Sequence, residues 1–237
     1  MSIDALWVLV PLKNLDRAKE RLAGVLDPHE RRELVGAMAR DVLDALLGVP
    51  LAAGQIVLVS DDAEVAALAH EFGTGILRPR PLMQDPLNAA LTEATDHVLR
   101  CGARHVLVLH ADLPCATSAE LRALIARHQA RLADDRGAHA TLVSDRAGSG
   151  TNCLLSSPPA AFPYRFGAGS RRLHHEAGAA AGVALAEFDA DGLRRDIDEP
   201  TELAELVAAL QSLQNGCGAH TARLLQRLRP PSSPNRG

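Results

Sequence analysis

The chain has 237 residues, of which 47% are hydrophobic and 23% charged, a composition typical of a globular protein with one large core. The net charge of −4 and the aromatic content of 3% argue against a general nucleic-acid binder, because such proteins carry basic faces and stacking rings. No apolar stretch approaches the roughly 20 residues that a membrane span requires, and no two cysteines form a C-x-x-C pair. We therefore expect a cytoplasmic protein with neither nucleic-acid nor membrane partners.

Short apolar runs alternate with longer segments of helical periodicity along the first 144 residues. The expected strands are Ala5–Val10, Gln55–Ser60, Gly75–Arg78, His105–Leu109 and Ala140–Ser144. The expected helices are Pro28–Leu47, Asp62–Glu71, Leu87–Cys101 and Ser118–Arg131, the first of them capped by Asp27. Strands separated by helices predict an α/β fold with a mostly parallel, mixed, Rossmann-like sheet that carries helices on both faces.

The later part of the chain has a different composition. Residues 146–172 are rich in Gly, Ser and Pro, so we expect them to form loops over the site, followed by a helix through His174 and His175. Another helix is expected to begin at Pro200. We predict a single domain over residues 1–210 and a partly disordered C-terminal tail over residues 211–237.

Four cations follow the first expected strand within nine residues: Lys13, Arg17, Lys19 and Arg21. Positive charges at the end of a strand can neutralise a triphosphate and help pyrophosphate to leave. Lys13 and Lys19 are also the only two lysines of the chain. The alternative is an ordinary solvated helix start, in which these side chains are surface residues.

Two acidic positions are candidates for holding a metal ion. An apolar strand leads directly to Asp112, and Pro114 breaks the chain just after it. Asp196 and Asp198 point to the same side if their segment is extended. Mg²⁺ prefers carboxylates together with phosphate oxygens, which three aspartates near a nucleotide would provide. The alternatives are that Asp112 caps a turn and that Asp198 caps the helix beginning at Pro200.

Other loop residues suggest ligand contacts. The loops Ser149–Asn152 and Gly167–Ser170 offer backbone N–H groups and hydroxyls that suit a phosphate or a carboxylate, although both could be plain flexible hairpins. Asp61 lies at the carboxyl end of an expected strand, where ligands of such sheets bind. Asn88 could contact a ribose or a base, or serve as a helix cap. The pattern disfavours a metal shared by His174 and His175.

Several short motifs occur in a recognisable order. They are Pro11-x-Lys13, Ala18-Lys19-x-Arg21-Leu22, Val59-Ser60-Asp61, Leu87-Asn88, Ala111-Asp112-Leu113-Pro114, Gly150-Thr151-Asn152, Gly167-x-Gly169-Ser170 and Asp196-Ile197-Asp198. Over about residues 5–207 the chain resembles the 2-phospho-L-lactate guanylyltransferases, also described as phosphoenolpyruvate guanylyltransferases, of coenzyme F-420 biosynthesis. His110 stands where the family commonly has Pro, and Phe166 stands where it usually has Tyr. Both border the acceptor side, and the tail lies outside the resemblance.

The resemblance implies a nucleotidyltransferase-like fold of the GT-A type and transfer of GMP from GTP to a small phosphorylated acid. It implies Mg²⁺ on Asp112, Asp196 and Asp198, with Lys19 and Asp112 as catalytic residues. The implied GTP-binding residues are Lys13, Lys19, Arg21, Ser60, Asp61 and Asn88. The implied acceptor-binding residues are Thr151, Gly167, Gly169 and Ser170. Phosphoenolpyruvate, 2-phospho-L-lactate and 3-phosphoglycerate are the candidate acceptors.

Two other functions stay open at this point. One is a nucleotidyltransferase of the molybdopterin or sugar-phosphate type, although those enzymes usually have a Gly-rich first loop containing Arg where this chain has Pro11-Leu-Lys13. The other is a nucleotide-binding sensor without catalytic activity. A homodimer formed through an exposed sheet edge is also left open.

Overall fold

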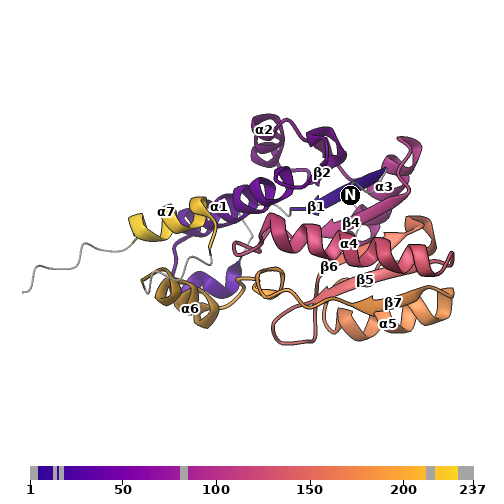
Figure 1. The fold of residues 1–237 in the computed structure, drawn as a ribbon. Helices are drawn as coiled ribbons and strands as arrows, with labels where there is room; N and C mark the ends of the chain where they lie inside the picture. Colours follow the sequence, from indigo (N-terminus) through magenta and orange to yellow (C-terminus); the bar gives the residue numbers. More distant parts are fainter. Residues whose placement is uncertain (1–4, 13–14, 16–18, 81–84, 212–216, 229–237) are drawn as a thin grey trace, which may run out of the picture.

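The computed structural model describes residues 5–12, 15, 19–80, 85–211 and 217–228, and it contains one seven-stranded sheet (Figure 1). The strands are β1 (Leu6–Pro11), β2 (Ile56–Val59), β3 (Gly75–Leu77), β4 (His105–Leu109), β5 (His139–Ser144), β6 (Thr151–Ser157) and β7 (Ala184–Glu187). Their order across the sheet is β3-β2-β1-β4-β6-β5-β7. β6 runs antiparallel to both of its neighbours, and all the other pairs are parallel. The predicted mostly parallel, mixed sheet is confirmed.

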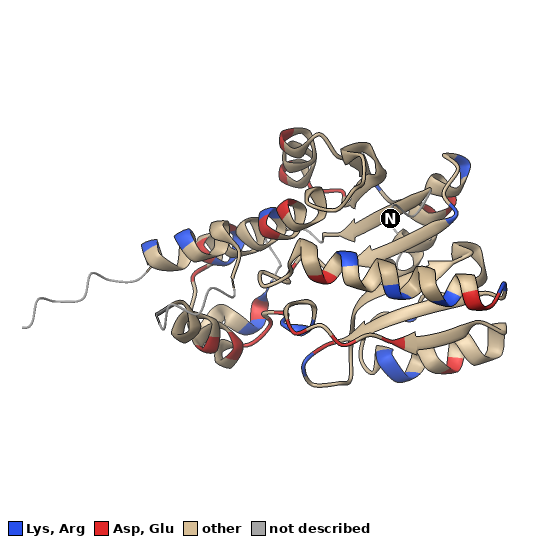
Figure 2. Cartoon of the chain, viewed as in Figure 1, with Lys and Arg blue, Asp and Glu red and all other residues tan. Residues whose placement is uncertain are grey.

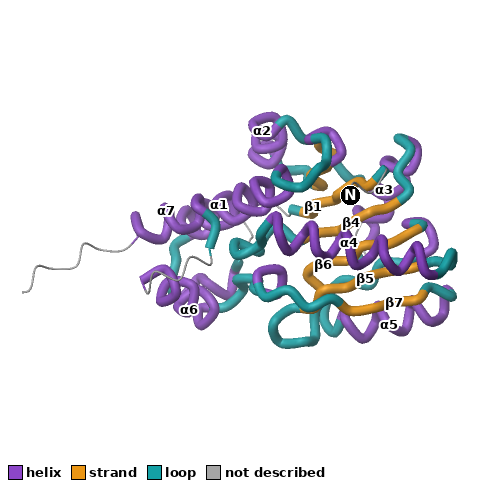
Figure 3. The backbone as a smooth tube through the Cα atoms, viewed as in Figure 1, coloured by secondary structure: helices purple, strands orange, loops and turns teal. Residues whose placement is uncertain are grey.

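Helices cover both faces of this sheet, with α4 in front and α3 behind in the view of Figure 3. They are α1 (Pro28–Leu47), α2 (Ala63–Phe72), α3 (Pro86–Arg100), α4 (Ser118–Asp134), α5 (Ser170–Ala181), α6 (Pro200–Gln211) and α7 (Ala219–Leu228). Among the described residues, no helix is both long enough and apolar enough to cross a membrane.

Alternate residues of the central strands enter two hydrophobic cores, one on each face. In β1, Val8 and Val10 belong to the core under α1 and α4, whereas Leu9 belongs to the core under α3. Burial on both faces explains why the central strands are continuous apolar runs. The seven described strands contain no Lys, Arg, Asp or Glu except Glu187 at the end of β7, so the charges lie on helices and loops (Figure 2).

The predicted start of α1 is confirmed. The carboxylate of Asp27 accepts a hydrogen bond from the N–H of Glu30 at 2.8 Å, and the carboxylate of Glu30 accepts one from the N–H of Asp27 at 2.8 Å. Pro28, which has no N–H to satisfy, takes the first helical position. α6 begins at Pro200 as expected. At that end the side chain of Glu202 accepts the N–H groups of Asp198 and Glu199, at 2.6 and 2.8 Å.

One expectation about the region after β5 was wrong, and one further strand was not predicted. Residues 151–157, expected as loop, form β6, which lies between β4 and β5 and is buried throughout. Its apolar run is short, and the Gly, Ser and Pro residues on both sides concealed it in the sequence. Residues 184–187 form the unexpected edge strand β7, which is half exposed and therefore lacks a strong apolar pattern.

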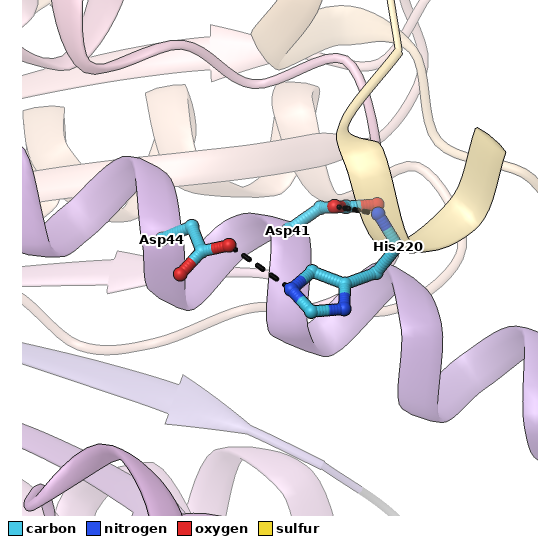
Figure 4. A group of neighbouring side chains, drawn as sticks. All are labelled: Asp41, Asp44 and His220. Carbon is cyan, nitrogen blue, oxygen red and sulfur yellow. Dashed lines mark hydrogen bonds and ion pairs between the residues drawn. The ribbon is translucent and has the colours of Figure 1, made fainter. Parts of the chain in front are cut away.

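The C-terminal segment contains the helix α7, which packs on α1 through Leu224 and Leu225. Its first N–H groups are capped from another helix, because the carboxylate of Asp41 in α1 accepts from the N–H of His220 and of Thr221, both at 2.9 Å. The His220 imidazole also contacts Asp44 at 3.1 Å (Figure 4). The capping residue lies far away in the sequence, so the start of this helix has no local capping signal.

Candidate active site

A cavity of about 960 Å³ opens where the carboxyl ends of β1, β2 and β4 meet. Since β6 is antiparallel, its first residues lie at this same edge, and the N–H of His110 donates to the carbonyl of Asn152 at 3.1 Å. The predicted site residues that line the cavity are Lys19, Arg21, Ser60, Asp61, Asp112, Thr151, Gly167, Gly169, Ser170, Asp196 and Asp198. The structure thus brings together residues that are spread over most of the sequence.

A second cavity of about 780 Å³ lies between α1, α2 and α7, and none of the predicted site residues lines it. Its rim includes ion pairs that join these helices, such as Arg32 with Glu64 and Arg227 with Glu33. Because these arginines are already paired within the fold, the first cavity is the better candidate for a ligand site.

The centre of the first cavity is a buried ion cluster. The ammonium group of Lys19 lies 2.6 Å from Oδ2 of Asp112 and 2.5 Å from Oδ1 of Asp198, and its side chain is 7% exposed. Lys19 has a left-handed backbone (φ 55°), which is uncommon outside glycine, and the short helix Glu20–Gly24 that follows is anchored by the buried Leu22. This backbone turn directs the lysine toward the aspartates.

Each charged group of this cluster stabilises the ionised form of its partner. Burial by itself lowers the pKa of Lys19, but the carboxylates of Asp112 and Asp198 outweigh burial, so the pKa lies above its ordinary value. Burial likewise raises the pKa of Asp112, but Lys19, with a smaller contribution from His110, brings that pKa below its ordinary value. Lys19 is therefore a cation and Asp112 an anion at neutral pH.

Within the part of the chain that the structure describes, no cation pairs with Asp196. Burial, together with repulsion from Asp112 and Asp198, raises the pKa of Asp196 to about 6, although the amide of Asn152 donates to its Oδ1 at 3.2 Å. Ile197 is buried in the core between the two aspartates, and its N–H bonds to the carbonyl of Asp112 at 3.3 Å. This extended segment directs both of its carboxylates to the cavity, as their i, i+2 spacing predicts.

The chemistry of these residues suits a divalent cation, although their carboxylate oxygens do not all lie within 4.8 Å of one another. Among the described residues, one lysine pairs with two of the three carboxylates, which leaves surplus negative charge. None of the described residues donates a hydrogen bond to the buried Oδ1 of Asp112. An unsatisfied buried carboxylate oxygen within an acidic cluster is the donor chemistry that Mg²⁺ prefers. The side chain of Asp198 contacts Lys19 while Glu202 takes the helix N–H groups, which favours the site role of Asp198 over the capping role.

The residues predicted to bind the nucleotide differ in their exposure and in whether they line the cavity. Arg21 is exposed at the rim and pairs with Glu199 at 3.2 Å. Asp61 follows β2, and Lys13 lies outside the described residues. Asn88 is buried beside the cavity and not in its wall, because its side-chain amide bonds to the N–H and the carbonyl of Phe166 at 2.8 and 2.9 Å. Asn88 thus supports the chain that leads to the second glycine loop.

The acceptor side is built from β6 and the start of α5. Gly167 and Gly169 have positive φ angles, 128° and 69°, which other residues rarely adopt, and Gly169 caps α5. Thr151 and Ser170 are buried at this end. The N–H groups of Ser170 and Arg171 at the start of α5 donate to the carbonyls of Gly167 and Ser149, both at 3.1 Å. This wall therefore offers an anion the hydroxyls of Thr151 and Ser170 and the positive end of the helix dipole. Gly150 is also required, since a Cβ there would lie 2.6 Å from Oδ2 of Asp145.

Three neighbouring residues were not predicted as site residues. The rings of His110 and Phe166, the two departures from the family pattern, lie 5.2 Å apart, and both line the cavity. Asn152 holds Asp196, although its motif alone gave no reason to assign this contact. These contacts cross between β4, β6 and the loop that follows β6, so a linear pattern could not reveal them.

The fold is shared with solved structures of nucleotide-handling transferases. A protein from Desulfovibrio desulfuricans G20, described as a nucleotide-diphospho-sugar transferase, has the same fold with a TM-score of 0.72 at 16% identity, over 95% of each chain. A cytidylyltransferase from Leptospira borgpetersenii has a TM-score of 0.58 at 10% identity, over 94% of this chain and 93% of that one. At these identities the likeness concerns the fold.

The chain matches the guanylyl transferase CofC-like family over residues 6–237 and belongs to that family. It is 38% identical over 205 residues to the phosphoenolpyruvate guanylyltransferase of Rubrobacter xylanophilus, covering 86% of this chain and 95% of that protein. It is 37% identical over 229 residues to the enzyme of the same name from Nocardia farcinica, covering 95% and 93%. The predictions of guanylyl transfer and of a role in coenzyme F-420 biosynthesis are confirmed. The family match includes the tail, so the expectation that the resemblance ends near residue 207 was wrong.

Proposed function

We propose that this enzyme transfers GMP from GTP to phosphoenolpyruvate in a Mg²⁺-dependent reaction. The observation that carries the proposal is the ion cluster of Lys19 with Asp112 and Asp198, with Asp196 close to both aspartates, on one side of a cavity whose other side is the start of a helix. The names of the relatives support phosphoenolpyruvate as the acceptor. The alternatives 2-phospho-L-lactate and 3-phosphoglycerate are the competitors in the test below.

In this reaction a phosphate oxygen of the acceptor attacks the α-phosphorus of GTP. A new P–O bond joins the acceptor to GMP, the bond between the α-phosphorus and its bridging oxygen breaks, and pyrophosphate leaves. The attacking oxygen is already an anion, so no strong general base is required. Catalysis then rests on alignment of the two phosphates and on neutralisation of their charge.

The proposed roles follow from the electrostatics. Asp112, Asp196 and Asp198 would hold Mg²⁺, which supplies positive charge to the phosphate oxygens when it is bound. Lys19, a buried cation, balances two of these carboxylates and lies where it can contact the phosphates of GTP. Lys13 and Arg21 are proposed to bind the triphosphate from the first loop, together with Ser60 and Asp61 on the nucleotide side. Asn88 is not included, because both ends of its side-chain amide bond to the backbone of Phe166.

The acceptor is proposed to bind at Thr151, Gly167, Gly169 and Ser170. This wall has hydroxyls and a helix N-terminus and no carboxylate of its own among these four residues, so it favours an anion. The acidic wall would repel the same anion unless a metal ion neutralised it. The acceptor is therefore oriented with its carboxylate toward β6 and α5 and its phosphate toward GTP.

The test is release of pyrophosphate by the purified enzyme with GTP and Mg²⁺, measured in parallel for the three candidate acceptors. We expect release with phosphoenolpyruvate and little with the other two. Asp134→Asn, which changes an exposed carboxylate at the end of α4, is the matched control for Asp112→Asn. GTP binding without release for any acceptor would contradict the proposal and favour the sensor function.

Two further expectations remain proposals. A cytoplasmic location is supported by the free thiols of all four cysteines, since reducing compartments keep thiols reduced. A homodimer would have to use an edge of the sheet such as β3, where Ile76 is exposed. Light scattering after size-exclusion chromatography would decide between a monomer and a dimer.

A further inference from the structure

A completely buried imidazole lies directly behind the acceptor side of the cavity. His174 of α5 is 0% exposed. Its Nδ1 lies 3.0 Å from Oγ1 of Thr151, and its Nε2 lies 2.9 Å from the backbone nitrogen of Arg165. One side chain thus joins the first residue of β6, the loop before Gly167, and the helix whose N-terminus faces the cavity.

The second of these contacts fixes the position of the ring proton. A backbone N–H can only donate, so Nε2 must accept from Arg165 and carries no proton. Burial, with smaller contributions from Arg165, His110 and His175, lowers the pKa of His174 to about 4, so the ring is neutral at pH 7. A neutral imidazole carries its single proton on the other nitrogen, Nδ1, which therefore donates to Thr151.

The direction of this hydrogen bond determines what Thr151 can do. Its Oγ1 accepts from His174, so its own hydroxyl proton must point elsewhere. Within the described part of the chain, Oγ1 of Thr151 has no other hydrogen-bond partner, and Thr151 lines the cavity. The hydroxyl is therefore available as a donor to a ligand in the cavity.

We propose that His174 is a positioning residue that fixes the Thr151 hydroxyl as a hydrogen-bond donor to an anionic oxygen of the acceptor. This inference rests on the proposed function, in which Thr151 binds the phosphorylated acid, and it adds the reason why that position selects an anion. A hydroxyl that is held as a donor binds a carboxylate or phosphate oxygen and leaves a donor group of the ligand unpaired.

The same ring also has a structural role that the test must separate from positioning. It packs edge-on against Phe166 with ring centroids 4.8 Å apart, and it lies 5.7 Å from Phe162. Removing the imidazole would therefore disturb the second glycine loop as well as Thr151. Simple truncation to alanine cannot distinguish these two effects.

Two amide substitutions separate them. His174→Gln places an acceptor oxygen near the position of Nε2, so it keeps the contact with Arg165 and loses donation to Thr151. His174→Asn places an amide nitrogen near the position of Nδ1, so it keeps the donation. We expect His174→Gln to raise the KM of the acceptor about 10- to 100-fold, the loss expected for a hydrogen bond to a charged group, and His174→Asn to raise it less. The KM of GTP should change little in both.

A double-mutant cycle with Thr151→Val supplies a readout that a purely structural role would not move. In the Thr151→Val background, His174→Gln should raise the acceptor KM much less than it does in the wild type, because its effect acts through the lost hydroxyl. His175→Gln is the matched control, since this neighbouring ring is 44% exposed and pairs with Glu187 outside the site. Additive effects in the cycle, or equal losses for GTP and the acceptor, would overturn the inference.

The proton position can also be measured in the wild-type enzyme, without relying on the folding of the His174 variants. Imidazole ¹⁵N NMR, with the His174 signals identified by their shift in Thr151→Val, should show a protonated Nδ1 and an unprotonated Nε2. A protonated Nε2 would overturn the inference even if the enzyme were active. Absence of pyrophosphate release by the wild type with every acceptor would instead refute the proposed function, and the ¹⁵N result would still decide the tautomer.

Discussion

The two walls of the cavity differ in how they carry charge. The acidic wall has full charges, with Lys19 between Asp112 and Asp198 and, among the described residues, no cation paired with Asp196. The wall proposed to bind the acceptor has neutral hydroxyls at the start of a helix, one of them held by a neutral imidazole. The acidic wall should therefore depend on metal and pH, whereas the acceptor wall should depend on geometry.

The largest expected effect concerns the acidic wall. Asp112→Asn should lower kcat by about 1,000-fold or more, the scale of losing a main electrostatic group in an active site. The side chain keeps its shape, so the fold should be retained, while loss of the buried ion pair with Lys19 should lower the thermal midpoint. Steady-state kinetics together with circular dichroism would test this. Near-normal turnover of the variant would remove Asp112 from the metal site.

Lys19→Met should lower kcat about 100-fold, because the only described lysine of the acidic wall is lost while the aliphatic stem is retained. The acceptor KM should change less than kcat, because the acceptor wall does not contain Lys19. Arg127→Met is the matched control, since this arginine is exposed on α4 and does not line the cavity. Equal losses in both variants would mean that the buried position of Lys19 has no special role.

On the acceptor wall, Ser170→Ala and Thr151→Val should each raise the KM of the acceptor about 10-fold or more and leave the KM of GTP nearly unchanged. Neither substitution changes a charge, so the Mg²⁺ dependence should also be unchanged. Initial rates at varied acceptor and saturating GTP would measure this. A parallel loss of GTP affinity would contradict the assignment of separate roles to the two walls.

The pH dependence of stability should also distinguish the walls. The folded protein binds the Asp196 proton more tightly than the unfolded chain does, since burial raises the pKa of Asp196 from 3.8 to about 6. Stability in the absence of Mg²⁺ should therefore fall as the pH rises from about 4 to 6 through this group. Asp196→Asn should stabilise the metal-free protein at pH 7 by at most about 2 kcal/mol, because each pKa unit corresponds to about 1.4 kcal/mol and water screens a half-buried carboxylate.

Denaturant unfolding at pH 4 and pH 7, with and without Mg²⁺, would measure this effect. The variant should be more stable than the wild type only at the higher pH, while it loses activity. A variant that is less stable at pH 7 would mean that Asp196 stabilises the fold, contrary to the electrostatics described here.

The smallest effect on activity is expected outside both walls. Asp41→Asn removes the carboxylate that caps α7 from α1 and should cost about 1–2 kcal/mol of stability, the range for a lost helix cap. Turnover should remain within a few-fold of the wild type, because Asp41 does not line the active-site cavity. Thermal unfolding monitored alongside activity would show whether α7 belongs to the cooperative fold.

The sequence predicted the parts of this enzyme whose signal is local. The strand that leads to Asp112 and the helix start with Asp27 as cap and Pro28 in the first position each depend on neighbouring residues, and both were placed correctly. The i, i+2 spacing of Asp196 and Asp198 predicted two carboxylates on one side, and both line the cavity.

The parts that were missed depend on distant partners. β6 is stabilised by β4 and β5 on its two sides, so its short apolar run was read as loop. α7 takes its cap from Asp41. From the sequence, Asn88 could contact a ligand or cap a helix. Its hydrogen bonds to the backbone of Phe166, a residue distant in the sequence, are visible only in the structure.

The most direct test of the central claim is the ³¹P NMR spectrum of a reaction with GTP, phosphoenolpyruvate and Mg²⁺. If the two walls bring the acceptor phosphate to the α-phosphorus of GTP, the product must show two mutually coupled diphosphate resonances, one from each substrate, together with free pyrophosphate. Production of GDP and inorganic phosphate without that coupled pair would contradict the account, because it would mean that water attacks the terminal phosphate and that the acceptor wall does not present the acid.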